Sequence, residues 1–323
     1  MRAVHLTDFG NPVDGLRFVE IPEPPEPGAG EVLVAVELSP VNPNDLSVAR
    51  GTYAFRPKLP AVIGNEGVGR VLRVGADVST VETGDRVLLP LSSFAWRERM
   101  VIPAGRLFAL PADADPQQLA MLGINPPTAS LLLSEFVSLN PGEWVVQNAA
   151  NSGVGRWVIA FAKVRGLRTV NIVRRPELVS ELMALGADVV LVDSPDVGRE
   201  IKEAVAQADV RLALDGVSGP ATGVLMAALA LHGTVAIYSA MSRAPITANP
   251  LDAIFKSLTL RGFFMGHPEL ADKIQAATKE AAAMIAAGQV RIPVAATYPL
   301  SAIKDAVAHV QRGGKVLLDV VGA

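Results

Sequence analysis

A strand, a turn of small residues, a helix and a second strand follow one another between residues 144 and 173. This order constrains the fold more than any other feature of the chain. An apolar run begins at Trp144, and apolar residues recur at helical spacing over residues 158–162. Gly166 is suited to end that helix, and a second apolar run covers residues 169–173. Parallel strands need a crossover of this kind, so the pattern predicts a βαβ unit in an α/β sheet.

The turn between the first strand and the helix has side chains small enough for a phosphate group to approach the backbone. Ala150, Ser152 and Gly155 occupy the glycine positions of the G-x-G-x-x-G pattern, and Gly153 adds a position without a side chain. The N-terminus of the helix would offer free N–H groups and a positive dipole end. An ordinary strand-to-helix turn is the alternative. The residues expected to bind a dinucleotide pyrophosphate are Asn148, Ser152, Gly153, Val154 and Gly155.

Two arginines, Arg174 and Arg175, follow the second strand directly. A site for NADH usually has Asp or Glu here, which binds the ribose hydroxyls. An arginine instead pairs well with the 2′-phosphate, which a carboxylate would repel. The sequence therefore predicts NADPH as the cofactor, with Arg174 as the closer contact. Two solvated arginines before Pro176 are the alternative.

Composition excludes several other classes of protein. The 323 residues are enough for two domains, and 50% hydrophobic with 19% charged residues is typical of a compact globular chain. A net charge of −3 with scattered Lys and Arg argues against nucleic-acid binding. Runs of about 18 apolar residues are absent and residues 1–10 lack a signal-peptide core, so we expect no membrane span and a cytoplasmic location. The absence of cysteine excludes disulfides and cysteine-ligated zinc or iron–sulfur sites.

Short strands between proline and glycine turns predict a β-rich first domain. Residues 31–38 alternate between apolar and polar side chains, after a proline-rich stretch that ends in a glycine turn. Further strands are expected over residues 68–74, 86–91 and 100–102. Together they predict a small, partly open barrel.

Beyond Pro116 the pattern changes to alternating helices and strands. Helical spacing over residues 117–122 and 128–136 leads into the βαβ unit. Four more strands are expected over residues 189–192, 212–215, 234–238 and 258–262, with helices over 177–185, 198–207 and 220–231. These elements predict a doubly wound, six-stranded parallel sheet of the Rossmann type.

The C-terminal tail is predicted to return to the first domain. It has an amphipathic helical pattern over residues 268–288, followed by a strand, a helix and a closing strand within residues 298–321. The expected division is therefore residues 1–118 with 267–323 as one domain, and residues 119–266 as the dinucleotide-binding domain.

This order of domains resembles the medium-chain dehydrogenase/reductase superfamily over essentially the whole chain, which implies that the β-rich domain is GroES-like. Gly64-Asn65-Glu66-Gly67-Val68-Gly69 is similar to the superfamily's G-H-E-G-x-G element. Asn65 replaces a histidine that helps to bind catalytic zinc in the alcohol dehydrogenases, and a cysteine ligand near residues 42–45 is missing. The resemblance thus implies a zinc-free branch with no metal site.

Among the zinc-free branches, three segments resemble the 2-enoyl thioester reductases more than the quinone reductases. They are Val41-Asn42-Pro43-Asn44-Asp45 with the following Gly51-Thr52-Tyr53, Asn125-Pro126-Pro127-Thr128-Ala129, and the asparagine-rich turn over residues 147–155. The resemblance implies reduction of the carbon–carbon double bond of an enoyl-CoA or enoyl-ACP with NADPH. A reductase of quinones or other activated alkenes is the alternative, and a non-catalytic NADPH-binding protein is a third.

The resemblance also implies roles for particular residues. Tyr53 falls on the active-site tyrosine, and a phenol with a pKa of about 10 is a neutral proton donor at physiological pH. Asn44 is expected to hydrogen-bond Tyr53 or the nicotinamide ribose, or else to cap the helix that follows. Phe264 stands where the family has a tryptophan, which leaves the acyl-chain specificity open; plain packing at the sheet end is the alternative. Thr128 is expected at the ribose, or else only at the start of its helix, and Gly216 is expected beside the cofactor, or else only in a turn. Tyr238 and Ser239 are expected near the carboxamide, and Phe263 and Phe264 complete the residues expected at the cofactor. The expected partners are a small-molecule substrate and a second copy of the chain in a homodimer.

Overall fold

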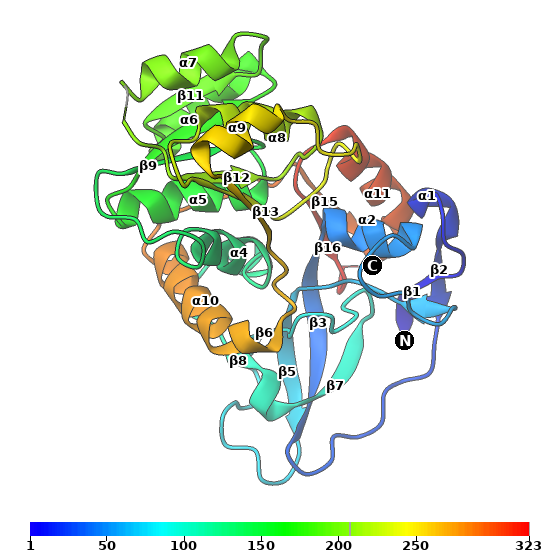
Figure 1. Cartoon of the computed structure of the whole chain (residues 1–323). Coiled ribbons are helices and arrows are strands. Elements are labelled where there is room, and N and C mark those ends of the chain that lie inside the picture. The colour runs from blue at the N-terminus through cyan, green and yellow to red at the C-terminus, as the bar shows by residue number, and fades with distance from the viewer. Residues whose placement is uncertain (207, 323) are drawn as a thin grey trace. The chain divides into compact units, whose positions relative to one another are not determined.

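Two units make up the part of the chain that the computed structural model describes, residues 1–206 and 208–322 (Figure 1). One unit is Met1–Ile124 with Thr278–Ala323, and the other is Asn125–Ala277. The sequence placed these limits at residues 118 and 267. Residue 207, the last of an expected helix, and residue 323, the end of the expected tail, lie outside the described residues. No helix in the described ranges is long and apolar enough to cross a bilayer.

The first unit is built around one long strand, β3 (Glu31–Val41). It pairs antiparallel with β5 (Val68–Val74), β7 (Arg99–Pro103) and β16 (Val316–Asp319). Register shifts occur in the β3–β5 ladder, which is where a sheet bends. The sheet order is β15-β16-β3-β5-β6-β8, with β6 at Arg86–Leu88, β8 at Phe108–Ala109 and β15 at Ala296–Pro299. A smaller sheet has the order β2-β1-β4, from Leu16–Glu20, Arg2–Leu6 and Ala61–Val62.

Helices and turns complete this unit. They are α1 (Pro12–Gly15), α2 (Pro43–Arg50), η1 (Ala104–Arg106), α3 (Pro116–Leu119), η4 (Leu300–Ala302) and α11 (Ile303–Arg312). The helix α10 (Ala271–Ala286) crosses the limit between the two units.

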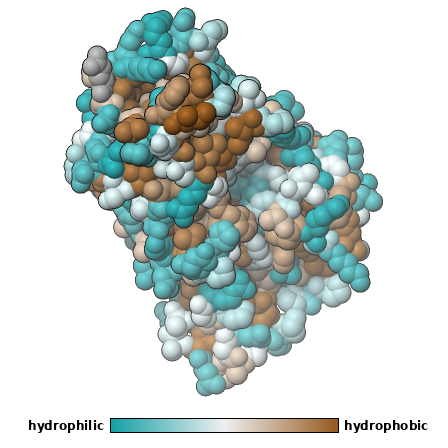
Figure 2. Space-filling view, viewed as in Figure 1, coloured by the Kyte–Doolittle hydropathy of each residue, from teal (hydrophilic) through white to brown (hydrophobic). Residues whose placement is uncertain are grey.

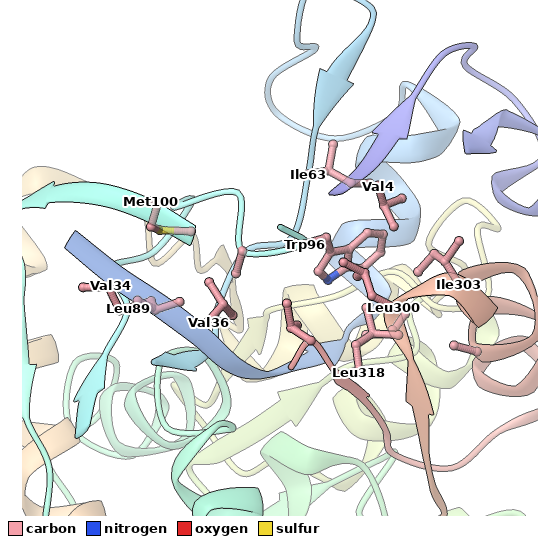
Figure 3. Packing of buried hydrophobic residues seen from close by; sticks show 14 of the residues in the cluster. Val4, Val34, Val36, Ile63, Leu89, Trp96, Met100, Leu300, Ile303 and Leu318 are labelled. Atoms are coloured by element: carbon pink, nitrogen blue, oxygen red, sulfur yellow. The ribbon is translucent and has the colours of Figure 1, made fainter. Parts of the chain in front are cut away.

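The core of the first unit joins the two ends of the chain. Trp96 is fully buried among Val4, Ile63 and Leu300 (Figure 3). Gly64 passes so close to this indole that an added Cβ would lie 2.4 Å from Trp96 Cδ1. Because the C-terminal segment supplies part of this core, its return is required to cover the β-rich unit.

The second unit has one parallel sheet in the order β11-β10-β9-β12-β13-β14, which confirms the doubly wound fold. Its strands are β9 (Trp144–Gln147), β10 (Arg168–Val173), β11 (Val189–Val192), β12 (Leu212–Asp215), β13 (Thr234–Ile237) and β14 (Thr259–Gly262). Its helices are α4 (Asn125–Leu132), α5 (Gly153–Val164), η2 (Pro176–Leu178), α6 (Val179–Leu185), α7 (Val197–Ala204), α8 (Pro220–Ala228), α9 (Pro250–Lys256) and η3 (Pro268–Leu270).

Some helix limits differ from the sequence-based expectation for local reasons. The helix α4 begins at Asn125, three residues before the expected start, because prolines are well tolerated in the first turn of a helix. The expected helix over 268–288 starts with the separate turn η3, and α9 was not predicted. The strand order reverses between β9 and β12, so their carboxyl ends form the switch point at which such sheets bind ligands.

Candidate active site

The first group of site residues lies at the start of α2. Asn42 precedes the helix in an extended conformation, and Pro43 occupies its first position. Asp45, the third helical residue, accepts a hydrogen bond from the backbone N–H of Asn42 at 2.8 Å. Gly51 ends the helix with a φ of 72°, a left-handed conformation that favours glycine. Asn42 and Asp45 therefore cap α2, and Asn44 Oδ1 accepts from the backbone N–H of Asp45 at 3.0 Å in the same turn.

Asn44 also contacts Tyr53, which follows the end of α2. The Asn44 side chain hydrogen-bonds the Tyr53 phenol, whose ring also meets Phe55 edge-on at 5.5 Å between centroids. Burial raises the pKa of Tyr53, the Asn44 hydrogen bond lowers it, and the nearby charge of Asp45 raises it. The phenol is therefore neutral at physiological pH and able to donate a proton.

A polar cluster connects the start of α2 with the G-N-E-G-V-G element, residues 64–69. Asp45 Oδ1 accepts from the backbone N–H of Asn65 at 2.9 Å and from Asn65 Nδ2 at 2.8 Å. Asn42 Nδ2 donates to Glu66 Oε1 at 2.7 Å, and Lys315 Nζ donates to Asn42 Oδ1 at 2.6 Å. Four residues of this cluster are buried: Asn42, Asp45, Asn65 and Glu66. Over the described ranges, no set of three or more His, Cys, Asp or Glu side chains is placed to hold a metal ion.

The second group of site residues lies at the start of α5. Ser152 precedes the helix, and its Oγ accepts from the N–H of Gly155 at 3.1 Å. The N–H groups of Gly153 and Val154 have no hydrogen-bond partner in the described chain. These free donors at the N-terminus of a helix of 12 residues fit a phosphate group, which needs such donors.

Two glycines in this turn lie close to other atoms of the second unit. An added Cβ at Gly155 would lie 2.5 Å from the carbonyl oxygen of Ala150, so this glycine allows the helix to approach the strand end closely. An added Cβ at Gly153 would lie 2.7 Å from Asn125 Nδ2. The position at Gly153, which we expected to be unobstructed, is thus already faced by an amide side chain.

Asn148 connects the ends of two neighbouring strands. Its Nδ2 donates to Asp215 Oδ1 at 2.7 Å, and its Oδ1 accepts from the N–H of Gly216 at 2.8 Å. Asp215 also accepts from Thr222 Oγ1 at 2.6 Å and from the N–H groups of residues 217 and 218. Both ends of the Asn148 amide are used in this way, so its observed contacts hold the turn in shape.

Tyr238 follows β13, and its hydroxyl lies near Ser152, which precedes α5, and near Gly216. An added Cβ at Gly216 would lie 2.5 Å from this hydroxyl. Burial raises the pKa of Tyr238, while the side chain of Ser152 acts in the opposite direction. The buried hydroxyl has no hydrogen bond of normal geometry to any described residue. We expected Tyr238 near a carboxamide, whereas its hydroxyl is beside Ser152; Ser239, next in sequence, accepts from Ser218 Oγ through its carbonyl.

The two arginines after β10 are both exposed. Arg174 has no ion-pair or hydrogen-bond partner in the ranges that the structure describes. Arg175 lies 3.7 Å from Glu177, with Nε and Oε1 as the closest atoms. Arg174 is therefore the guanidinium that is available to an anionic group of a ligand.

The remaining expected residues belong to the second unit. Thr128 is buried in the first turn of α4, and its Oγ1 lies 3.6 Å from Met265 Sδ. Phe263 packs edge-on against Phe136 at 6.0 Å between ring centroids. Phe264 is 41% exposed and meets the ring of His267 at 5.5 Å, so it is not part of the sheet-end core.

The polar residues of these groups that were given no role of their own from the sequence include Asn42, Asp215 and Lys315. Asn42 belongs to the V-N-P-N-D segment, whose local pattern could have indicated a cap. Asp215 ends a predicted strand, but its partner Asn148 is 67 positions away. Lys315 has no local signal, because its partner is 273 positions earlier.

Comparison with known proteins adds independent findings. A family model described as alcohol dehydrogenase GroES-like domain matches residues 28–111, and one described as zinc-binding dehydrogenase matches residues 153–287. The mitochondrial enoyl-[acyl-carrier-protein] reductase of Rattus norvegicus is 39% identical over 271 residues, which cover 82% of this chain and 72% of the relative. The enzyme of that name from Homo sapiens is 36% identical over 288 residues, covering 85% and 76%.

Solved structures of two kinds are similar. The complex of Etr1p with NADP and crotonyl-CoA has a TM-score of 0.89 and 28% identity, covering 99% of both chains. The Etr1p/Etr2p heterodimer of Candida tropicalis, a mitochondrial 2-enoyl thioester reductase, has a TM-score of 0.89 and 27% identity with the same coverage. The quinone oxidoreductase of Escherichia coli complexed with NADPH has a TM-score of 0.88 and 25% identity, covering 99% of this chain and 100% of that one.

Proposed function

Because the chain belongs to the medium-chain dehydrogenase/reductase superfamily, and within it to the enoyl thioester reductases, we propose that it reduces the double bond of a 2-enoyl thioester with NADPH. The substrate class is an enoyl-CoA or an enoyl carried on acyl carrier protein. The observation that carries this proposal is the neutral phenol of Tyr53, held by Asn44 on the segment that follows α2.

The reaction adds one hydride and one proton across the double bond. When bound, NADPH supplies the hydride that the β carbon of the substrate accepts. Tyr53 has a neutral O–H. Its role is to donate this proton to the α carbon of the enolate that hydride addition produces. Asn44 holds the phenol in place for this step. The phenol then recovers its proton from solvent.

Residues of the second unit are proposed to hold the cofactor. The free N–H groups of Gly153 and Val154 would bind the pyrophosphate, since they lie at the N-terminus of α5. Arg174 would pair with the 2′-phosphate and so favour NADPH over NADH. Asn148 and Asp215 keep the two strand ends in the shape that this requires.

A quinone or activated-alkene reductase is the second candidate, favoured by the similarity to the quinone oxidoreductase of Escherichia coli. A substrate panel with NADPH at fixed pH separates the candidates. Oxidation of NADPH by crotonyl-CoA but not by quinones supports the enoyl reductase. The reverse result supports the quinone reductase, and tight NADPH binding without turnover indicates a non-catalytic protein.

We propose that the chain forms a homodimer through the outer edge of the Rossmann sheet. The strand β14 is at the end of the sheet order and all four of its residues are exposed. Next to it in sequence, α9 exposes Leu251, Ile254 and Phe255, the last at 75%, and Figure 2 shows an apolar patch over α9. An unpaired edge beside apolar surface favours association with a second copy. Light scattering should give twice the monomer mass, and Phe255→Glu should shift it to the monomer.

The cellular location remains a prediction. The sequence favours the cytoplasm, whereas the curated relatives are named mitochondrial. Imaging of the full chain with a C-terminal fluorescent tag in the source cell would decide between the two.

A further inference from the structure

A lysine from the C-terminal tail reaches the cap of the helix that precedes Tyr53. Lys315 begins the segment that forms β16, directly after Gly313 and Gly314, whose φ values are 112° and 100°. The strand β16 pairs with the end of β3 (Figure 1). This pairing brings Lys315 next to the start of α2. Its Nζ donates to Asn42 Oδ1 at 2.6 Å. A contact across 273 positions of sequence thus ends on a helix cap.

The Asn42 side chain connects Lys315 to the buried carboxylate of Glu66. Its oxygen accepts from Lys315, and its nitrogen donates to Glu66 Oε1 at 2.7 Å. The reverse orientation would place an N–H group against the ammonium and an oxygen against the carboxylate. Lys315 and Glu66 therefore permit only one orientation of the Asn42 amide. They also hold Asn42 itself in one position before α2.

The backbone of Asn42 is fixed from a second side. Its N–H donates to Asp45 Oδ2, while Asp45 Oδ1 accepts two hydrogen bonds from Asn65. One ammonium and two carboxyl groups thus surround the first turn of α2. Asn44, which holds the Tyr53 phenol, lies between Asn42 and Asp45 in this turn.

We infer that Lys315 is a positioning residue for the reduction: through Asn42 it fixes the first turn of α2, and thereby the hydrogen bond between Asn44 and Tyr53. This inference rests on the proposed function, in which Tyr53 donates the proton. Without the ammonium, Asn42 Oδ1 would lose its donor in a region that water reaches poorly, and the two carboxyl groups would lose their cation. The first turn would then have to move or loosen.

The charges of Asp45, Glu66 and Lys315 make the consequence of losing the Lys315 ammonium depend on pH. Burial raises the pKa of Asp45 to about 7 and raises the pKa of Glu66, and the charge of Lys315 opposes both shifts. Burial lowers the pKa of Lys315, and the two carboxylates oppose that shift. Tyr53 is the remaining titratable group that interacts with Asp45. Loss of the Lys315 ammonium should therefore disturb the first turn of α2 most at a pH where both carboxyl groups are ionised.

The test compares Lys315→Met with Lys315→Gln, Lys315→Arg and a matched control, Lys304→Met, which changes an exposed lysine on α11 of the same unit. Hydrogen–deuterium exchange measures the order of residues 42–53, and steady-state kinetics with crotonyl-CoA measure turnover. NADPH affinity is followed by fluorescence titration.

We expect Lys315→Met to exchange faster over residues 42–53 and to lose about ten-fold in kcat, with NADPH affinity unchanged. The loss should be larger at about pH 8.5 than at about pH 6, because Asp45, whose pKa is about 7, ionises between these values. Lys315→Gln keeps a donor for Asn42 and should lose less, Lys315→Arg should recover most of the activity, and Lys304→Met should behave as the unmodified protein.

Unchanged exchange over residues 42–53 in a folded Lys315→Met variant would overturn the inference. An equal loss of kcat at both pH values would also overturn it. If Lys315→Met does not fold, Lys315→Gln and Lys315→Arg decide the outcome by the same two measurements. Because the exchange measurement does not depend on turnover, loosening of residues 42–53 in a protein inactive on crotonyl-CoA would support the positioning by Lys315 and reject the proposed function.

Discussion

Asn44 hydrogen-bonds the phenol of Tyr53 across the glycine that ends α2. The phenol is partly buried and its pKa is raised, so in the proposed reaction its O–H is the proton donor. We predict that Tyr53→Phe lowers kcat for crotonyl-CoA by about ten-fold or more, since a positioned general acid contributes at least this much. NADPH affinity should not change. Tyr298→Phe, outside the site, is the control, and an unchanged kcat in Tyr53→Phe would remove this residue from the mechanism.

Arg174 has no partner in the described part of the chain, whereas Arg175 is near Glu177. We therefore predict that Arg174→Ala weakens NADPH binding by about ten-fold or more, as expected for loss of a charge-assisted phosphate contact. NADH binding should change little, and Arg175→Ala should have the smaller effect. Calorimetric titration with both nucleotides checks this, and equal losses for NADPH and NADH would contradict the assignment.

The hydroxyl of Tyr238 is close to Ser152 and to the backbone of Gly216, which places it beside the turn that is proposed to bind the pyrophosphate. We predict that Tyr238→Phe weakens NADPH and 2′-phospho-ADP-ribose equally, because both ligands contain the pyrophosphate. Titration of the variant with each ligand is the measurement. A loss confined to NADPH would instead assign Tyr238 to the nicotinamide end, which 2′-phospho-ADP-ribose lacks.

Gly155 allows α5 to approach the end of β9, because an added Cβ would lie 2.5 Å from a backbone oxygen. Backbone cannot move away as a flexible side chain would, so Gly155→Ala should destabilise the protein by about 1–3 kcal/mol. In Gly198→Ala, on α7 of the same unit, the new Cβ meets no atom within 4 Å. That control should be neutral or more stable by about 0.5–1 kcal/mol. Thermal unfolding of both variants tests this, and equal melting temperatures would be inconsistent with the packing described.

The buried carboxyl groups predict how stability depends on pH. The pKa of Asp45 is about 7 in the folded chain against an ordinary value of 3.8, and the pKa of Glu66 is raised as well. The folded state therefore binds more protons than the unfolded state in this range, so the free energy of unfolding should fall as pH rises from about 5 to about 8. Denaturant titrations across this range measure it. Asp45→Asn should be less stable but show a weaker fall; an unaltered slope would mean that Asp45 does not cause it.

Much of the fold could be predicted because buried parallel strands read as continuous apolar runs. The strands over residues 189–192 and 212–215 were predicted with their observed limits for this reason. In contrast, α9 has no buried residue, so it lacks the apolar periodicity from which helices are predicted.

The site could be predicted only where its residues are near one another in sequence. The turn over residues 148–155 and the pair of Asn44 and Tyr53 are of this kind. The pairs of Asn148 with Asp215 and Asn42 with Lys315 depend on strand pairing, which brings distant positions together and leaves no local pattern. The direction of the Tyr238 side chain also could not be derived, because the sequence indicates the end of a strand and not the side on which the ring lies.

The central claim is that a hydride from NADPH and a proton add to the double bond of an enoyl thioester. Isotope labelling tests it most directly. The full-length protein is incubated with crotonyl-CoA and NADPH deuterated at the transferable position, and in a parallel reaction with unlabelled NADPH in D₂O, and the products are analysed by NMR. The account predicts butyryl-CoA with deuterium at the β carbon in the first reaction and at the α carbon in the second. Recovery of unreduced crotonyl-CoA, or of product without deuterium at the β carbon in the first reaction, would contradict it.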